Sequence, residues 1–204
     1  EENTIIIFTA DNGASKASFP IEFEDKFQHK PSAHLRGRKA TLHQGGHTVP
    51  FIVQWKNTIQ PNTKSNTTIS LGDFYATCAE LVNAKTDKNQ GVDSYSILSL
   101  LKGQNKYDRK VSVYTNFAGR FSIRKGDFKM DLNPKKGSSY LFNIAKDPSE
   151  TNNLFYDEAY ADKKIELTLA LNYIILNGRS TTGEVLENDG PKVWKELFWM
   201  KNKK

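Results

Sequence analysis

Short apolar runs alternate with polar turns along the first half of the chain. Residues 4–9 form a β-branched run that ends in Ala10-Asp11-Asn12-Gly13, and residues 49–55 form a second apolar run. A continuous apolar run bounded by a turn is typical of a strand buried on both faces, as in a parallel sheet. Residues 13–48 between them show little periodicity. A loop of that length inside a compact domain is uncommon unless it has a function.

Two helices are expected after the second run. Ser70 and Asp73 have the spacing of a capping box, and apolar residues follow them at helical intervals. Cys78 belongs to this apolar stripe, so we expect a buried, inert thiol rather than a nucleophile. A short helix is expected over residues 96–102. Alternation of strands and helices indicates an α/β domain.

The pattern changes after about residue 108. Four short strand candidates separated by turns indicate a small antiparallel sheet, and a helix is expected over residues 159–176. The strand candidates are residues 111–115, 121–124, 128–132 and 140–143. The sequence therefore predicts an α/β fold in two parts. Residues 1–107 belong to an α/β domain with a mixed or parallel sheet, and residues 108–204 form an α+β subdomain with a tail.

Composition narrows the possible partners. The formal net charge of +6 suggests an anionic partner, although a basic surface that keeps the protein soluble explains it equally well. We find no zinc-ligand spacing, no aromatic RNA-binding motif and no long basic helix, so nucleic acid is not expected. No apolar run approaches the roughly 20 residues of a membrane span. The single cysteine excludes an internal disulfide.

Asp11 and Asn12 are the first candidates for chemistry. They follow the first predicted strand, and ligand sites in open α/β sheets gather at the carboxyl ends of strands. A carboxylate beside an amide carbonyl offers two hard oxygen ligands for Ca²⁺ or, less suitably, Mg²⁺. The tripeptide Asp-Asn-Gly is also an ordinary turn. Taken alone, the pattern favours the turn.

A glycine-rich basic segment over residues 35–50 is the second candidate. Its glycines permit the backbone to approach a ligand closely, and its cations can neutralise an oxyanion. A basic surface loop is an equally good explanation of the pattern alone. The residues concerned are Gly37, Gly45 and Gly46, with Arg36, Arg38 and Lys39.

The order of several motifs resembles the formylglycine-dependent sulfatases of the alkaline phosphatase superfamily, in their arylsulfatase A-like branch. The resemblance extends over nearly the whole chain, and so many ordered matches are very unlikely by chance. The motifs are Asp11-Asn12-Gly13, Leu35-Arg36-Gly37-Arg38-Lys39, Gly45-Gly46-His47-Thr48-Val49-Pro50-Phe51, Gly91-Val92-Asp93-Ser94, and Tyr140-Leu141-Phe142-Asn143 with residues 147–154.

The resemblance implies site residues and a cofactor. Asp11 and Asn12 match family ligands of a Ca²⁺ ion, and Lys39 matches a lysine that contacts the sulfate and assists the leaving oxygen. His29 falls where related carbohydrate sulfatases carry a His-x-Pro-Ser stretch near the substrate, although a solvated loop histidine is the simpler expectation. Arg38 replaces a residue that is often smaller, and contact with substrate or a contribution to surface charge are equal alternatives.

The family nucleophile is a formylglycine made from Cys or Ser in Cys/Ser-x-Pro-x-Arg, and this sequence contains no such motif. We therefore expect the chain to be the C-terminal portion of a longer enzyme, inactive by itself and partnered by the missing N-terminal half. The start Glu1-Glu2-Asn3, without Met or a leader, agrees with that expectation. The resemblance implies a periplasmic or secreted enzyme that hydrolyses sulfate esters of a glycan or an aryl group.

Two other functions stay open at this point. A phosphoester or phosphonate hydrolase of the same superfamily uses the same scaffold, and only the nucleophile motif separates it from a sulfatase. A non-catalytic module that binds polyanions through its basic loop is the second alternative.

Overall fold

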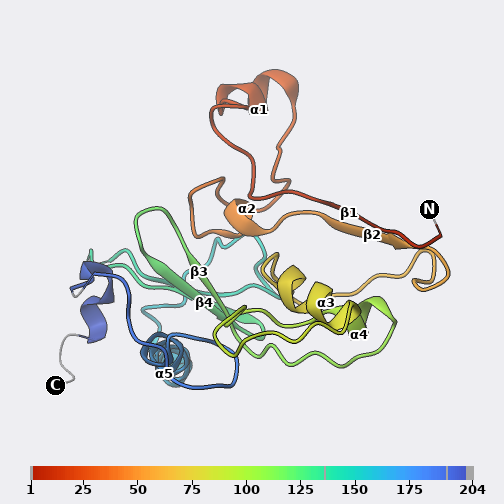
Figure 1. Cartoon of the computed structure of the whole chain (residues 1–204). Helices are drawn as coiled ribbons and strands as arrows, with labels where there is room; N and C mark the ends of the chain where they lie inside the picture. Colours follow the sequence, from red (N-terminus) through yellow and green to blue (C-terminus); the bar gives the residue numbers. More distant parts are fainter. Residues whose placement is uncertain (1, 136, 192, 201–204) are drawn as a thin grey trace. The chain divides into compact units, whose positions relative to one another are not determined.

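The computed structural model describes residues 2–135, 137–191 and 193–200 (Figure 1). They form two compact units, each built from segments that lie far apart in the sequence. The first unit contains residues 50–110 with two flanking segments, and the second contains residues 10–49 and most of the chain after Lys110. The predicted division into residues 1–107 and 108–204 stays a prediction, since each unit is made of several separate segments. The tail over residues 201–204 lies outside the described part.

The first unit contains a two-stranded antiparallel ribbon. Strand β1 (Ile5–Thr9) pairs with β2 (Phe51–Trp55), in a register that places Phe8 opposite Ile52. Both strands form where the sequence predicts them. Their expected burial on both faces is wrong, because Phe8 and Ile52 are 62% and 63% exposed. Within the described residues β1 has a single neighbouring strand, and most of the apolar side chains on its faces are exposed to solvent.

Helix α3 (Asp73–Leu81) follows in the same unit, with α4 (Leu98–Leu101) after it. The side chain of Asp73 accepts the backbone N–H of Ser70 at 2.9 Å, which is half of the predicted capping box. The expectation of a buried Cys78 is wrong, because its thiol is exposed. The buried positions of α3 are Asp73 and Thr77, so the helix turns a polar face inward and the stripe that carries Cys78 outward.

The second unit contains the predicted four-stranded sheet. Its strands are antiparallel and adjacent in chain order, as a meander. They are β3 (Ser112–Thr115), β4 (Phe121–Lys125), β5 (Phe128–Asp131) and β6 (Tyr140–Asn143). Helix α5 (Ala161–Asn177) follows a 3₁₀ turn (Glu158–Tyr160), and a second 3₁₀ segment (Lys195–Met200) comes later. The core side chains with no exposed surface are Ile123, Met130, Leu141, Phe142, Leu167 and Leu171.

The long segment between β1 and β2 also belongs to the second unit, and two short helices interrupt it. Helix α1 (Glu22–Phe27) lies at the far end of an extended excursion, and α2 (Gln44–His47) lies where that excursion returns (Figure 1). We call residues 10–49 the site loop, because it carries every candidate site residue. No helix in the described part of the chain is long and apolar enough to cross a membrane.

Candidate active site

Asp11 and Asn12 lie just beyond the end of β1, at the start of the site loop. Asp11 is exposed, and its Oδ1 accepts the backbone N–H of Asn12 at 2.9 Å. The side-chain amide of Asn12 donates to the carbonyl of Gly13 at 3.0 Å. That bond uses the Asn12 nitrogen and leaves its amide oxygen available as a ligand. One carboxylate and one amide oxygen therefore project from adjacent residues, as the sequence predicts.

Two glycines allow distant parts of the site loop to touch through their backbones. The N–H of Gly13 donates to the carbonyl of Gly46 at 3.0 Å, and a Cβ atom on Gly13 would lie 1.8 Å from the Gly45 carbonyl oxygen. A Cβ atom on Gly46 would lie 2.4 Å from the carbonyl oxygen of Thr41. No other residue fits such contacts without moving the backbone. The glycines thus join the start of the loop to its end.

Lys39 lies on a tight turn that this contact supports. The turn from Arg38 to Thr41 is closed by the N–H of Thr41, which donates to the Arg38 carbonyl at 3.0 Å, and by the Thr41 hydroxyl, which donates to the same oxygen at 2.7 Å. The N–H of Lys39 donates to the carbonyl of Ala14 at 3.1 Å. The side chain of Lys39 is exposed. The structure therefore brings the backbone of Lys39 next to the segment that begins with Asp11 and Asn12.

Arg38 points into the protein. It is 7% exposed, and its guanidinium group donates to the carbonyl of Phe19 and to the carboxylate of Glu24. A contribution to the basic surface is therefore excluded. The substrate contact predicted for Arg38 stays a prediction, and the ion pair with Glu24 makes Arg38 a poorer candidate than an exposed residue.

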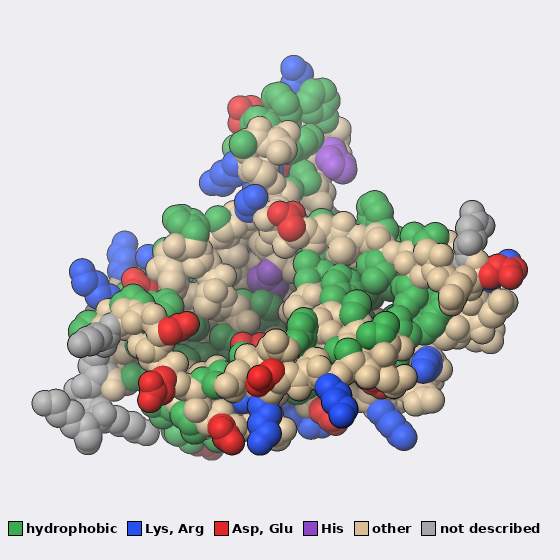
Figure 2. All heavy atoms as spheres, viewed as in Figure 1, with side chains coloured by type: hydrophobic (Ala, Val, Ile, Leu, Met, Phe, Trp, Pro, Cys, Tyr) green, Lys and Arg blue, Asp and Glu red, His purple; other side chains and the backbone are tan. Residues whose placement is uncertain are grey.

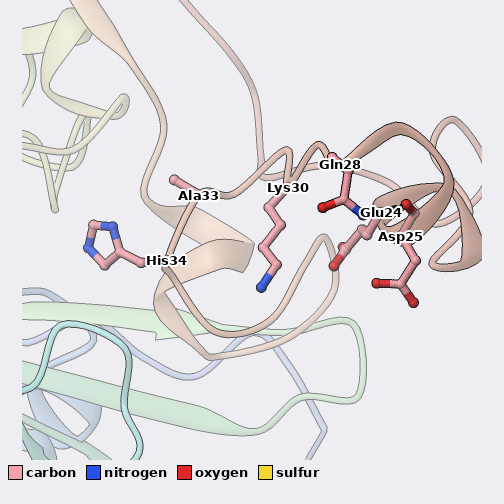
Figure 3. Close-up of a pocket in the computed structure, with 6 residues that line it drawn as sticks. All are labelled: Glu24, Asp25, Gln28, Lys30, Ala33 and His34. Carbon is pink, nitrogen blue, oxygen red and sulfur yellow. Dashed lines mark hydrogen bonds between the residues drawn. The ribbon is translucent and has the colours of Figure 1, made fainter.

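His29 lies on the excursion that carries α1, between Gln28 and Lys30 in the sequence, and these two neighbours line an open hollow. The exposed ring of His29 meets the edge of Phe19 at a centroid distance of 5.5 Å. The hollow has a volume of about 590 Å³. Figure 3 shows acidic and amide side chains on the α1 side and basic ones on the chain that leads away from it. The lining residues are Glu24, Asp25, Gln28, Lys30, Ala33 and His34, so neither Asp11 nor Lys39 belongs to this hollow.

A buried charged cluster beneath the site loop was not predicted as part of the site. Glu150 has no exposed surface. Its carboxylate accepts Lys129 Nζ at 2.6 Å and the backbone N–H of Gln44 at 2.7 Å, and His43 Nδ1 lies 3.4 Å away. The guanidinium group of Arg36 donates to the Glu150 carbonyl at 2.9 Å. One glutamate of the second unit therefore contacts three residues of the site loop.

Electrostatics favour the ionised form of Glu150 in this cluster. Burial opposes ionisation of Glu150, but His43 and Lys129 outweigh it and hold the pKa of Glu150 below its ordinary value. For Asp131, whose Oδ1 lies 3.3 Å from Lys129 Nζ, burial is the larger influence and raises the pKa. Glu150 is thus the anionic partner of Lys129. The sequence offered one signal, since Glu150 lies within the motif at residues 147–154.

His47 closes the loop against the sheet. Its ring stacks on Tyr114 of β3 at a centroid distance of 4.2 Å, and its Nε2 lies 3.0 Å from the Leu42 carbonyl. Burial and the charge of Lys129 lower the pKa of His47 to about 4. The imidazole is therefore neutral at physiological pH and packs as an aromatic ring.

The donor atoms of Asp11 and Asn12 can be compared with the ligands that Ca²⁺ prefers. Ca²⁺ takes six to eight oxygen ligands, and the donor types of Asp11 and Asn12 suit it. In the part of the chain that the structure describes, no cluster of three or more His, Cys, Asp or Glu residues could hold a metal ion. Asp11 and Asn12 therefore offer two oxygen donors of a type that Ca²⁺ binds, which is fewer than the ion requires.

Comparisons with known proteins identify the family of the chain. The family model described as Sulfatase matches residues 1–84, which include Asp11, Asn12 and Lys39. An N-acetylgalactosamine-6-O-sulfatase of Bacteroides thetaiotaomicron is 30% identical over 170 residues, covering 75% of this chain and 33% of that protein. The chain belongs to the sulfatase family. An arylsulfatase of Hemicentrotus pulcherrimus is 30% identical over 128 residues, covering 63% of this chain and 22% of that protein.

Solved structures confirm the fold of this sulfatase chain. One structure, from work on the metabolism of multiple glycosaminoglycans by Bacteroides thetaiotaomicron, superposes with a TM-score of 0.74 at 28% identity. The superposition covers 85% of this chain and 39% of that one. The predicted fold class, a mixed α/β part followed by a small antiparallel sheet with a helix, is confirmed. The chain spans about a third of the length of the first curated relative.

Proposed function

We propose that this chain is the C-terminal part of a calcium-dependent sulfatase that hydrolyses sulfate esters of a carbohydrate or an aryl group. Asp11 and Asn12 provide calcium ligands, and Lys39 contacts the sulfate. The observation that carries the proposal is the hydrogen bond from the Lys39 N–H to the Ala14 carbonyl, at 3.1 Å. It joins the turn that bears the cation to the segment that bears both oxygen ligands.

Each residue has a defined task in this proposal. The exposed ammonium group of Lys39 donates hydrogen bonds to sulfate oxygens and stabilises the negative charge that develops on the departing oxygen. Asp11 and Asn12 hold a Ca²⁺ ion, which supplies Lewis-acid stabilisation of the sulfuryl group when bound. His29 is the proposed substrate contact outside this centre, since its exposed ring can donate to a sugar hydroxyl.

The nucleophile is proposed to lie outside this chain. No Cys/Ser-x-Pro-x-Arg sequence occurs in the 204 residues, and the N-acetylgalactosamine-6-O-sulfatase named above is about three times as long as the segment it shares with this chain. A formylglycine in a preceding segment would meet Asp11, Asn12 and Lys39 across the assembled site. Export to the periplasm or the medium is part of the proposal, because sulfated glycans are extracellular. The substrate class rests on the N-acetylgalactosamine-6-O-sulfatase named above.

Two proteins, residues 1–204 and the complete enzyme, test whether the nucleophile lies outside this chain. Residues 1–204 alone are expected to release no 4-nitrophenol from 4-nitrophenyl sulfate, whereas the complete enzyme with calcium is expected to turn it over. Turnover by the isolated residues would contradict the proposed location of the nucleophile. Hydrolysis of 4-nitrophenyl phosphate in place of the sulfate by the complete enzyme would favour the phosphoester alternative.

Substitution of Lys39 tests its role in the complete enzyme. Lys39→Ala is expected to lower kcat by about 10²–10³-fold, because one preorganised donor to the developing charge is lost. Lys146→Ala is a matched control, since this lysine is also exposed but lies after β6, outside the site loop. A Lys39→Ala enzyme with the kcat of the control would refute the role of Lys39. Heparin retention that survives Lys39→Ala without calcium would instead support a polyanion-binding module.

Substitution of Asp11 tests the metal. Asp11→Ala is expected to lose bound calcium and activity together, because the variant lacks one of the two calcium ligands that we propose for this chain. Calcium content is measured by elemental analysis and activity by sulfate release. Normal calcium content in an inactive variant would refute the ligand assignment while leaving a substrate role for Asp11.

A further inference from the structure

Glu150 occupies a position that packing of the sheet alone does not require. It follows β6 on a turn in which the Glu150 N–H donates to the Asp147 carbonyl at 3.1 Å, and its φ is 54°, in the left-handed region. A residue other than glycine is strained in this backbone conformation and keeps it only when its surroundings fix it. Its carboxylate turns into the protein with no exposed surface. The contacts of that carboxylate are therefore what hold the residue in place.

Those contacts lead directly to the site loop. Glu150 Oε2 accepts the N–H of Gln44 at 2.7 Å, while Oε1 is fixed by Lys129 of β5 at 2.6 Å. The same glutamate accepts Arg36 through its main-chain carbonyl. Arg36 and Gln44 lie on either side of the Lys39 turn, and the N–H of Gly45 donates to the Arg36 carbonyl at 2.7 Å. The two ends of the turn are therefore hydrogen-bonded to each other. Glu150 connects both ends to the sheet.

From the two ends of the turn the connection continues to both parts of the proposed site. Gly46 follows Gln44 by two residues, and a Cβ atom placed on it would lie 2.4 Å from the Thr41 carbonyl oxygen and 2.8 Å from the Arg38 carbonyl oxygen, both in the turn that carries Lys39. The Gly46 carbonyl also accepts the N–H of Gly13, beside the proposed calcium ligands. A shift at Gln44 would therefore move Lys39 and the calcium ligands together.

We propose that Glu150 is a positioning residue of the sulfate site, which acts through Gln44 to set the place of Lys39 and of the Asp11–Asn12 pair. Glu150 touches neither substrate nor metal. This inference rests on the proposed function and adds to it a residue on the turn after the small sheet, on which the chemistry depends. Misplacement of a catalytic group by about 1 Å can cost about 10²-fold in rate.

Two substitutions at Gln44 together isolate the hydrogen bond from its N–H to Glu150. Gln44 is the first residue of α2, a position that tolerates proline, and His43 before it has φ −68° and ψ 157°, the extended conformation that a residue before proline adopts. Gln44→Pro therefore deletes the N–H that Glu150 binds. Gln44→Ala keeps that N–H and removes only the side chain, so the difference between these variants isolates the hydrogen bond.

The kinetic test uses the complete enzyme and these two variants, with Glu150→Gln as a third. Glu150→Gln and Gln44→Pro are expected to lower kcat for 4-nitrophenyl sulfate by about 10–100-fold relative to wild type and to Gln44→Ala. In a Lys39→Ala background the same substitutions are expected to cost severalfold less than in the wild type, because one of the two groups that they misplace is gone while the Asp11–Asn12 pair is still affected. Equal losses in both backgrounds, or a loss of thermal stability with kcat unchanged, would overturn the inference.

Hydrogen exchange on the same proteins separates this inference from the proposed function. Gln44→Pro is expected to speed amide exchange at Thr41, Gly45 and Gly46 at least tenfold, without changing the amides of β4 and β5. Unchanged exchange at the three loop amides would overturn the inference whatever the activity. If exchange becomes faster but the wild-type enzyme releases no sulfate, the structural role of Glu150 is supported and the proposed function is refuted.

Discussion

The β1–β2 ribbon and the β3–β6 sheet are built from similar apolar strands but differ in what covers them. In the sheet, Ile123, Met130 and Leu141 have no exposed surface. In the ribbon, Phe8 and Ile52 are more than half exposed. Figure 2 shows hydrophobic side chains gathered at the surface where Figure 1 places β1, β2 and α3. Apolar composition therefore decides that a strand forms, while burial depends on the layers available to cover it.

The same difference extends to the helices. In α5, Leu167 and Leu171 are fully buried beside the sheet, whereas Leu81 at the end of α3 and Val82 just after it are 37% and 70% exposed. Large exposed apolar patches on a protein mark surfaces that are covered by another segment or partner. The sheet and α5 bury their apolar side chains in a core within this chain. The ribbon and α3 expose apolar side chains of the kind that a core would bury.

Matched isoleucines provide the strongest test of this comparison. Ile123→Ala is expected to lower the free energy of unfolding of residues 1–204 by about 2–5 kcal/mol, because it leaves a cavity in the core of the sheet. Ile52→Ala in the ribbon is expected to change it by less than about 0.5 kcal/mol, because the side chain is 63% exposed. Urea denaturation of both variants measures the difference. Similar losses in the two variants would show that the ribbon has a packed face.

His47 provides the second test, through pH. Its pKa in the folded protein is about 4, against an ordinary value of 6.5, so between these values the unfolded chain binds a proton that the folded chain excludes. Stability is therefore lost as the pH falls from 6.5 to 4, by about 3 kcal/mol for a shift of this size. Lys129, Arg124 and Glu150 are the charged groups that act on the ring, and burial is the larger cause.

A substitution assigns that loss to His47. His47→Phe keeps a ring to stack on Tyr114 and cannot take up a proton, so its stability is expected to fall much less over the same pH range. Thermal unfolding of the two proteins at pH 7 and pH 4.5 gives the comparison. A wild-type protein whose stability does not change between these pH values would show that His47 is solvated.

The sequence predicts the elements well because they follow from local patterns. All four strands of the small sheet and the helix α5 are confirmed within a few residues, since apolar alternation and turn residues such as Gly126 act over short distances. Burial of Cys78 was wrong for the opposite reason. Helical periodicity identifies an apolar stripe, but only the tertiary structure shows whether anything packs against it.

The site was predictable where its residues are adjacent and not where they are distant. Asp11 and Asn12 form one motif, and Lys39 forms part of another. The link from Glu150 to Gln44 joins residues 106 positions apart, and no spacing rule predicts such a contact. The burial of Arg38 depends in the same way on Glu24 of α1, a helix that the sequence pattern did not indicate.

Glu166 on α5 provides a smaller test, within the region that has a core. Hydrogen bonds from Lys125 and Lys163 lower the pKa of Glu166 to about 2. The carboxylate is 37% exposed and screened by solvent, so Glu166→Gln is expected to cost only about 0.2–1 kcal/mol at low salt. In 1 M NaCl the cost is expected to approach zero. A larger or salt-independent loss in the free energy of unfolding, measured by urea denaturation, would mean that this face of α5 is buried.

Phe8→Lys provides the smallest expected effect on folding and the most direct test of the uncovered ribbon. Phe8 is 62% exposed and faces Ile52 across the strand pair, so its replacement in residues 1–204 is expected to change the free energy of unfolding by less than about 0.5 kcal/mol. The charge interrupts the apolar surface beside the open edge of β1, and we expect less self-association in sedimentation experiments. A loss above about 2 kcal/mol would instead show that Phe8 contributes to a packed core, and the contrast between ribbon and sheet would then be one of degree.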